Sequence, residues 1–219
     1  MLYESAKFSL YAQFITGVID TWGLTMKVPI EKELFKTLLK IELGVQIVEF
    51  IFYLWLVQNI KTNPNVTKYR YFDWMITTPL MLLTLMALLA SDSYKFTNLQ
   101  EFISLNKSLI KEVFILNFLM LYFGYLGETG VIPIKESVIL GFIPFLLYYK
   151  KIYDSLIKNK NVNIFSKKIF FYFFFIWSVY GIAALFPYKT KNTIYNILDL
   201  FSKNLFGLFL VYIIYTNRI

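Results

Sequence analysis

Apolar residues in this chain gather in seven long runs, separated by short stretches of charged and turn-forming residues. A bilayer core about 30 Å thick is crossed by about 20 mostly apolar helical residues. Runs of that length predict seven transmembrane helices rather than soluble amphipathic ones. Proline and glycine mark several of the breaks, as in Asn63-Pro64-Asn65. The predicted spans cover 6–26, 33–58, 69–90, 109–126, 133–156, 165–187 and 193–215.

Composition supports a membrane protein. The 219 residues are 58% hydrophobic, 20% aromatic and only 16% charged, which is too little polar surface for a soluble domain of this length. Cysteine and histidine are absent, so disulfides, Cys/His zinc sites and thiol or histidine catalysis are excluded, and neither a metal site nor an enzyme is expected. The links are too short for a second domain, so we expect one domain over 1–219. The start, Met1 to Lys7, lacks the features of a cleaved signal peptide.

Lysines divide unevenly between the two sets of loops. Fourteen basic residues fall on one side and six on the other, and cytoplasmic loops collect positive charge. The division predicts an all-α seven-helix bundle with its N-terminus outside and its C-terminus in the cytoplasm. It also accounts for the net charge of +8 without nucleic acid as a partner.

One connection, 91–108, is longer than the others. Phe96, Leu99, Phe102 and Leu105 recur there every three residues. This spacing fits an amphipathic helix lying on the cytoplasmic surface, and it fits equally well an ordinary connector with a few apolar contacts.

Ionisable residues inside membrane spans are costly, so each is a functional candidate. Asp199 and Lys203 lie four residues apart in the last span, and Arg70 and Asp73 lie in the third. A bare salt-bridge network of these four is one interpretation. The other is that Lys203 forms an imine with an aldehyde, for which Asp73 and Asp199 would be the counter-ions.

An aldehyde with a long apolar body would need a slot lined by flat rings. Trp74, Trp177 and Tyr180 could line such a slot. Taken singly, each ring is explained by ordinary packing in a chain that is one-fifth aromatic. Only in combination with the buried lysine and the carboxylates do these rings indicate a binding site.

Two motifs resemble those of the microbial (type 1) rhodopsins, and the resemblance extends over all seven spans. The motifs are Arg70-Tyr-Phe-Asp-Trp-Met-Ile-Thr-Thr-Pro-Leu80 and Leu198-Asp-Leu-Phe-Ser-Lys-Asn204. The resemblance implies all-trans retinal on Lys203, Asp73 as primary counter-ion and proton acceptor, and Asp199 as second counter-ion. It further implies that the neighbours of the chromophore are Arg70, Trp74, Thr77, Thr78, Asn117, Met120, Gly124, Trp177 and Tyr180.

The chain departs from the proton-pump pattern of that family. Thr84 stands eleven residues after Asp73, where a pump usually has a carboxylate proton donor. Gly181 and Ala184 stand where relatives often have proline and tryptophan. The last loop offers Lys189 and Lys191 but no carboxylate for outward proton release.

Polar residues form a stripe along each of the first two spans. Glu42, Gln46, Glu49 and Tyr53 follow helical spacing in the second span, and Ser9, Gln13, Thr16 and Asp20 follow it in the first. Such stripes are costly in a membrane unless they are wetted, and carboxylates along them would favour cations. We therefore expect an ion pathway through Ser9, Glu42, Gln46, Glu49, Asn196 and Asn204. The alternatives are an interface between protomers of a homo-oligomer, or Glu42 as a substitute proton donor.

Glutamates in the second span and Asn204 directly after the lysine resemble the channelrhodopsins. The small size and the AT-rich codon bias resemble the viral rhodopsins of giant viruses, including their channel-forming group 1. We therefore expect a light-gated cation channel that is a multi-pass membrane protein, in a host cell membrane if the chain is viral. An outward proton pump is the main alternative, followed by a sensory photoreceptor with a transducer partner and by a transporter without a chromophore.

Overall fold

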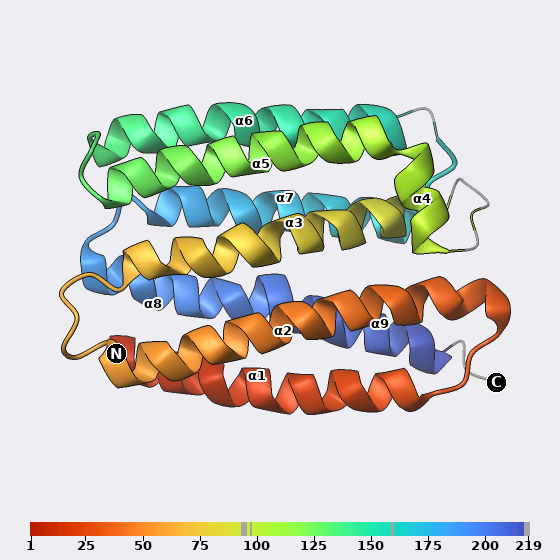
Figure 1. Cartoon of the computed structure of the whole chain (residues 1–219), viewed down its shortest axis with the longest axis horizontal. Helices are drawn as coiled ribbons and strands as arrows, with labels where there is room; N and C mark the ends of the chain where they lie inside the picture. Colours follow the sequence, from red (N-terminus) through yellow and green to blue (C-terminus); the bar gives the residue numbers. More distant parts are fainter. Residues whose placement is uncertain (93–95, 97, 159, 217–219) are drawn as a thin grey trace.

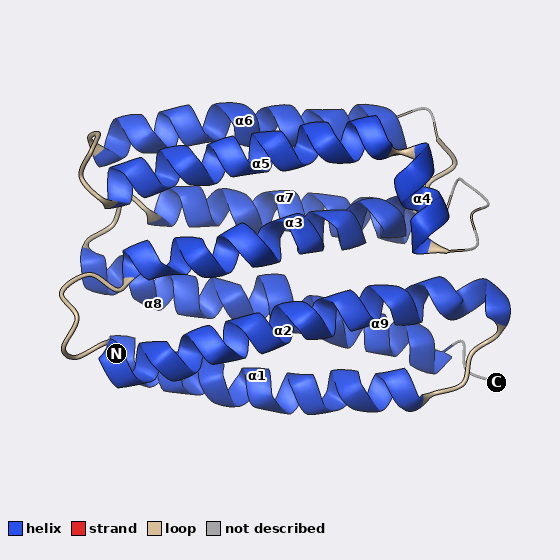
Figure 2. Ribbon diagram, in the orientation of Figure 1, coloured by secondary structure: helices blue, strands red, loops and turns tan. Residues whose placement is uncertain are grey.

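The computed structural model describes residues 1–92, 96, 98–158 and 160–216. Within them every regular element is helical (Figure 2). The elements are α1 (Leu2–Thr25), the short 3₁₀ turn η1 (Ile30–Lys32), α2 (Glu33–Asn59), α3 (Thr67–Ser91), α4 (Leu99–Leu105), α5 (Lys107–Glu128), α6 (Ile134–Leu156), α7 (Ile164–Ala183), α8 (Tyr188–Asp199), η2 (Leu200–Asn204) and α9 (Leu205–Thr216).

The long helices run side by side in one bundle (Figure 1). Helices α5 and α6 pack closely against each other, as do α1 and α2, and α3 packs against both α2 and α5. The last span, made of α8, η2 and α9, packs against α1, α2 and α7. Because α3 and this last span carry the intramembrane charges, the candidate site lies inside the bundle.

Each of the seven predicted spans coincides with a helix. By length and composition alone, four of the described helices could cross a membrane, namely those over Glu33–Asn59, Thr67–Ser91, Lys107–Glu128 and Tyr188–Thr216. The polar stripe of α1 lowers its mean hydropathy. Three predicted boundaries were wrong by four or five residues: the first helix begins at Leu2 rather than at 6, the sixth ends at Ala183 rather than at 187, and the seventh begins at Tyr188 rather than at 193.

The surface of the bundle is apolar and its interior carries the polar groups. Large hydrophobic side chains such as Phe8, Phe14, Ile51 and Phe175 are more than half exposed. Glu49, by contrast, is fully buried. A soluble protein has the opposite arrangement, and lipid is the solvent that suits this one. The chain is an integral membrane protein.

The long connection contains the helix α4, which covers only Leu99–Leu105 of the apolar pattern that runs from Phe96 to Leu105 in the sequence. The side chain of Asn98 caps it by accepting a hydrogen bond from the backbone nitrogen of Glu101 at 2.9 Å. Phe102 is completely buried in the core, whereas Leu105 is 66% exposed. Part of the connection, 93–95 and 97, lies outside the described residues. In the described part, Phe102 packs into the bundle rather than outward along a membrane surface.

Candidate retinal site

Lys203 lies in η2, a π-helical segment in the middle of the last span, and only 2% of its side chain is exposed. Its Nζ lies 2.7 Å from Asp73 Oδ2, 3.6 Å from Glu49 Oε1 and 4.0 Å from Asp199 Oδ1. Asp73 is thus the nearest acid, as the sequence predicts. Glu49, which we assigned to the ion pathway alone, is a third acid beside the amine.

Asp199 is held by three groups from three other helices. Tyr53 of α2 donates a hydrogen bond to Oδ2 and Tyr180 of α7 donates one to Oδ1, both at 2.6 Å. Nη1 of Arg70 lies 3.3 Å from Oδ2. This network fixes Asp199 in place, and it leaves Asp73 as the carboxylate with the closest contact to the amine.

Arg70 is fully buried in the first turn of α3, and α3 begins at the same end of the bundle as α1 (Figure 1). Its guanidinium donates to Asn192 Oδ1 at 3.0 Å and to Asn196 Oδ1. Its carbon Cζ lies 5.4 to 5.7 Å from the ring centres of Phe52, Tyr53 and Tyr195. Aromatic faces and side-chain oxygens therefore stabilise this buried charge.

Thr77 and Thr78 are buried beside Asp73, but their hydroxyls turn to the backbone. Thr77 donates to the carbonyl oxygen of Asp73 at 3.0 Å, and Thr78 to that of Trp74 at 2.7 Å. Asn117 of α5 donates to the Thr78 hydroxyl at 2.8 Å. One carboxylate oxygen of Asp73, Oδ1, has no hydrogen-bond partner among the described residues.

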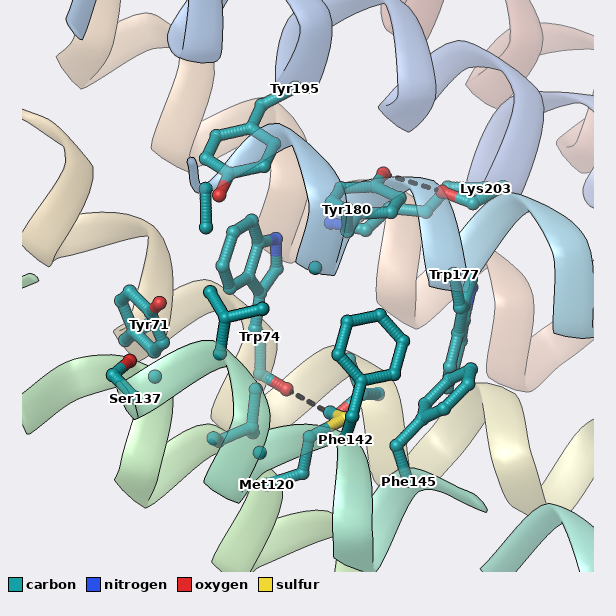
Figure 3. Close-up of a pocket in the computed structure, with 18 residues that line it drawn as sticks. Tyr71, Trp74, Met120, Ser137, Phe142, Phe145, Trp177, Tyr180, Tyr195 and Lys203 are labelled. Atoms are coloured by element: carbon teal, nitrogen blue, oxygen red, sulfur yellow. Dashed lines mark hydrogen bonds between the residues drawn. The ribbon is translucent and has the colours of Figure 1, made fainter. Parts of the chain in front are cut away.

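A largely apolar cavity extends from Lys203 between α3, α5, α6 and α7 (Figure 3). Its empty space is about 820 Å³, including the part open to the surroundings. The sequence predicted Trp74, Thr78, Met120, Gly124, Trp177 and Tyr180 as neighbours of the chromophore, and all six line it. Further lining residues that the sequence did not single out are Tyr71, Leu121, Ser137, Val138, Gly141, Phe142, Phe145, Tyr195 and Ser202.

Flat rings shape this cavity. Trp74 meets Tyr180 and Tyr195 edge to face, with ring centres 5.6 and 5.2 Å apart. Helix α5 has Gly124 opposite Tyr71, where a Cβ atom would lie only 2.8 Å from the tyrosine oxygen. The glycine thus allows the Tyr71 ring to approach the helix at the cavity wall.

The residues present fit retinal. The cavity has a primary amine at one side, where an aldehyde can be attached, and rings and a thioether that suit a polyene. Three carboxylates lie within 4.0 Å of Nζ and can balance a positive nitrogen. Asn117 does not line the cavity itself but supports Thr78, which does.

The two polar stripes face each other inside the chain. Ser9 donates to the carbonyl oxygen of Asn196 at 2.9 Å. Asn204 donates to Thr16 at 2.6 Å and to Gln46 Oε1 at 3.3 Å. All stripe residues are at most 6% exposed within a single copy of the chain. Because these side chains are already covered within one copy, they do not form its outer surface, which speaks against the stripes as a protomer interface.

Comparison with known proteins agrees with this geometry. A sequence model of the family described as bacteriorhodopsin-like protein matches residues 4–217, so the chain belongs to that family, the microbial rhodopsins. Proteins of this family bind retinal. A green-light absorbing proteorhodopsin from Gamma-proteobacterium EBAC31A08 is 26% identical over 163 residues, which cover 68% of this chain. The match spans only 61% of that relative's length.

Solved structures share the fold along almost the whole chain. The viral rhodopsin OLPVRII has 25% sequence identity and a TM-score of 0.82, with 98% of each chain covered. Xanthorhodopsin, described as a light-driven ion pump with dual chromophore, has 16% identity and a TM-score of 0.76, with 99% of this chain and 93% of that one covered. The second likeness concerns the fold alone.

Proposed function

We propose that this microbial rhodopsin is a light-gated cation channel with all-trans retinal attached to Lys203. When bound, retinal supplies a conjugated aldehyde that forms a covalent imine with the lysine amine and changes shape on absorbing light. The observation that carries the channel proposal is the contact of Asn204 with both polar stripes. Asn204 directly follows Lys203 in the chain, and these contacts make it part of the buried polar region between α1 and α2.

Asp73 is the group that we assign to accept the proton from the Lys203 nitrogen, because it lies nearest to it at 2.7 Å. Its unpartnered oxygen leaves capacity for that proton. Asp199 keeps its own bonds to Tyr53, Tyr180 and Arg70 and therefore remains the fixed negative charge. Loss of the close charge pair at Lys203 then weakens the link between α3 and the last span.

The ion path that we propose follows the buried face between α1, α2, α3 and the last span. Along this face Ser9 contacts Asn196, Asn204 contacts Gln46, and Glu49 lies beside Lys203. Glu42 lies seven residues before Glu49 on the same face of α2, and α2 begins at the end of the bundle where α4 lies (Figure 1). Side-chain oxygens recur along this face, and its carboxylates attract cations and repel anions. By the lysine distribution, the end with α4 is cytoplasmic.

An outward proton pump is the second candidate. Glu42 favours it, because this buried acid lies two helical turns before Glu49, which stands beside Lys203, and could return a proton to the lysine nitrogen in place of Thr84. A pump moves charge in one direction at every voltage, whereas a channel follows the gradient.

Photocurrent against membrane voltage distinguishes the two candidates. Cells that express the full chain with retinal are held at a series of voltages under two cation gradients. Current that reverses, with a reversal voltage that follows the gradient, supports the channel. Outward current at every voltage contradicts it and supports the pump. Glu49→Gln and Glu42→Gln should change conductance or selectivity more than colour.

Attachment of the chromophore is tested separately with Lys203→Ala. The variant should form no visible pigment, because it has no amine at this position, and it should give no photocurrent. Lys189→Ala is the matched control, since that lysine is exposed outside the cavity. After borohydride reduction, the mass of the chromophore should be found on the peptide that contains Lys203. Visible absorption that survives in Lys203→Ala would place the attachment elsewhere.

A further inference from the structure

Hydroxyl groups in the wall of the cavity beside Lys203 differ in how they are bonded. Near the lysine, the Tyr180 hydroxyl donates to Asp199 Oδ1 at 2.6 Å and lies 2.9 Å from the Ser202 hydroxyl. Ser137 of α6 also lines the cavity and is 1% exposed, yet its Oγ has no hydrogen-bond partner among the described residues. At least one buried hydroxyl of the wall is therefore free to bind a ligand group.

The Ser137 hydroxyl is turned away from its own helix. Serines inside helices often donate to a backbone carbonyl of the preceding turn, as Ser178 does to that of Phe174 at 2.7 Å. Ser137 makes no such bond, and its Oγ lies against α5, where a Cβ atom on Gly127 would overlap with it. The absence of a side chain at Gly127 leaves room for this hydroxyl. A buried hydroxyl without a partner is costly, so a ligand that bonds with it is favoured.

A second hydroxyl reaches the same face of α5. A Cβ atom on Gly124 would lie 2.8 Å from the hydroxyl oxygen of Tyr71, which also lines the cavity. Gly124 and Gly127 are three residues apart, which places them on one helix face with about 5 to 6 Å between them. The hydroxyls of Tyr71 from α3 and Ser137 from α6 therefore lie within about one helical turn of each other.

Tyr71 and Ser137 lie across the cavity from Lys203 (Figure 3). A retinal chain whose aldehyde end is attached to Lys203 carries its ring towards the opposite side of the cavity. The ring of plain retinal consists of carbon and hydrogen alone, so it leaves the Ser137 hydroxyl without a partner. A ring that carries an oxygen atom matches this part of the wall better.

We propose that Ser137 and Tyr71 form a subsite for an oxygen on the chromophore ring, and that the preferred chromophore is a ring-hydroxylated all-trans retinal. The ring hydroxyl bonds with Ser137 Oγ and with the Tyr71 hydroxyl. The aldehyde end is attached to Lys203 in the same way as that of plain retinal. This preference depends on the proposed attachment at Lys203 but not on the channel function.

Competition between two aldehydes tests the subsite. The full chain, produced without retinal and held in lipid, is given equal amounts of all-trans retinal and all-trans 3-hydroxyretinal. The bound chromophores are then released and separated by chromatography. The hydroxylated form should be enriched about fivefold, as expected for one net hydrogen bond.

Ser137→Ala should bring the ratio of the two bound forms close to one, and Tyr71→Phe should reduce the enrichment as well. Ser178→Ala is the matched control and should retain the enrichment, because that serine lies outside the cavity wall and is already bonded to its own helix.

Equal uptake of the two aldehydes by the parent chain overturns the subsite. So does an enrichment that persists in both Ser137→Ala and Tyr71→Phe, because other groups would then cause it. If Ser137→Ala does not fold, Tyr71→Phe, which retains the ring, decides alone, and an unchanged enrichment contradicts the subsite. Pigment with neither aldehyde contradicts the attachment at Lys203 and the subsite together, whereas equal pigment with both contradicts the subsite alone.

Discussion

Asp73 has the shortest contact to the Lys203 nitrogen, and the electrostatic consequences can be ranked by distance. Its Oδ2 lies 2.7 Å from Nζ, compared with 3.6 Å for Glu49 Oε1. At equal dielectric constant, the closer charge interacts about 1.3-fold more strongly. Asp199 lies farther, at 4.0 Å, and is shared with two tyrosines and Arg70.

Asp73→Asn should therefore shift the absorption of the pigment to the red, because it removes the nearest negative charge from the positive end of the chromophore. Glu49→Gln should cause a smaller shift in the same direction. Visible spectra of the two purified variants at one pH decide the order. An unchanged spectrum in Asp73→Asn, together with a large shift in Glu49→Gln or Asp199→Asn, would transfer the counter-ion role to that residue.

Sequence motifs singled out Asp73 and Lys203, which lie 2.7 Å apart in the structure, but not all of the groups around them. The two motifs pointed to Asp73 and Lys203 because a charged residue in a membrane-spanning helix is expected on the face that points into the bundle. Both residues do lie on such inner faces and contact each other. Glu49 was predicted for the ion pathway and not for the surroundings of Lys203. The spacing of polar residues along α2 shows which face of the helix Glu49 occupies, but it does not show which residue of another helix lies opposite. Tyr53 belonged to the same stripe, and its bond to Asp199 depends on that same unknown register.

At the scale of helices, Arg70 joins α3 to α2 and to the last span. It contacts Tyr53, Asn192, Asn196 and Asp199 and is fully buried. Removal of one partner from a buried ion pair leaves the other charge uncompensated and typically costs about 3 to 5 kcal/mol. The network therefore holds three helices together at this level.

Arg70→Ala should lower the temperature at which the purified protein loses its helical circular dichroism in detergent. Lys150→Ala serves as the control. It breaks the Lys150–Asp154 pair, in which the lysine side chain is 72% exposed, and such surface pairs contribute little. Equal melting temperatures for Arg70→Ala and the parent protein would show that the network is not needed for stability.

Helix existence was predictable from the sequence, whereas helix ends and irregularities were not. Seven apolar runs sufficed for the spans because lipid requires long helices that satisfy their own backbone. The last helix begins earlier than predicted, directly after Pro187, and it includes Lys191, which we placed in the preceding loop and which pairs with Glu128 of α5. That contact joins residues 63 positions apart, which local hydrophobicity does not report.

For the whole molecule, the lysine distribution predicts the orientation in the membrane. The chain contains no cysteine, so a single introduced cysteine is a unique label. Lys61 and Lys158 are both exposed and lie at opposite ends of the bundle by the course of the chain.

Lys61→Cys should react with a membrane-impermeant maleimide on intact cells, because the N-terminal side is expected outside. Lys158→Cys should react only after the cells are made permeable. Mass spectrometry or gel shift of the labelled chain measures both. Labelling in the reverse order would invert the orientation and, with it, the assignment of the end of the bundle with α4 to the cytoplasm.

The π-helical segment η2 also matters for any attempt to modify or transplant the last helix. A π turn accommodates one residue more than an α turn, so the side chains of α9 are rotated relative to a straight continuation of α8. Deleting one residue between Leu200 and Asn204 would remove that offset and turn Gly207 away from Asp20. Designers who graft this helix onto a regular seven-helix scaffold therefore need to carry the bulge along with the lysine.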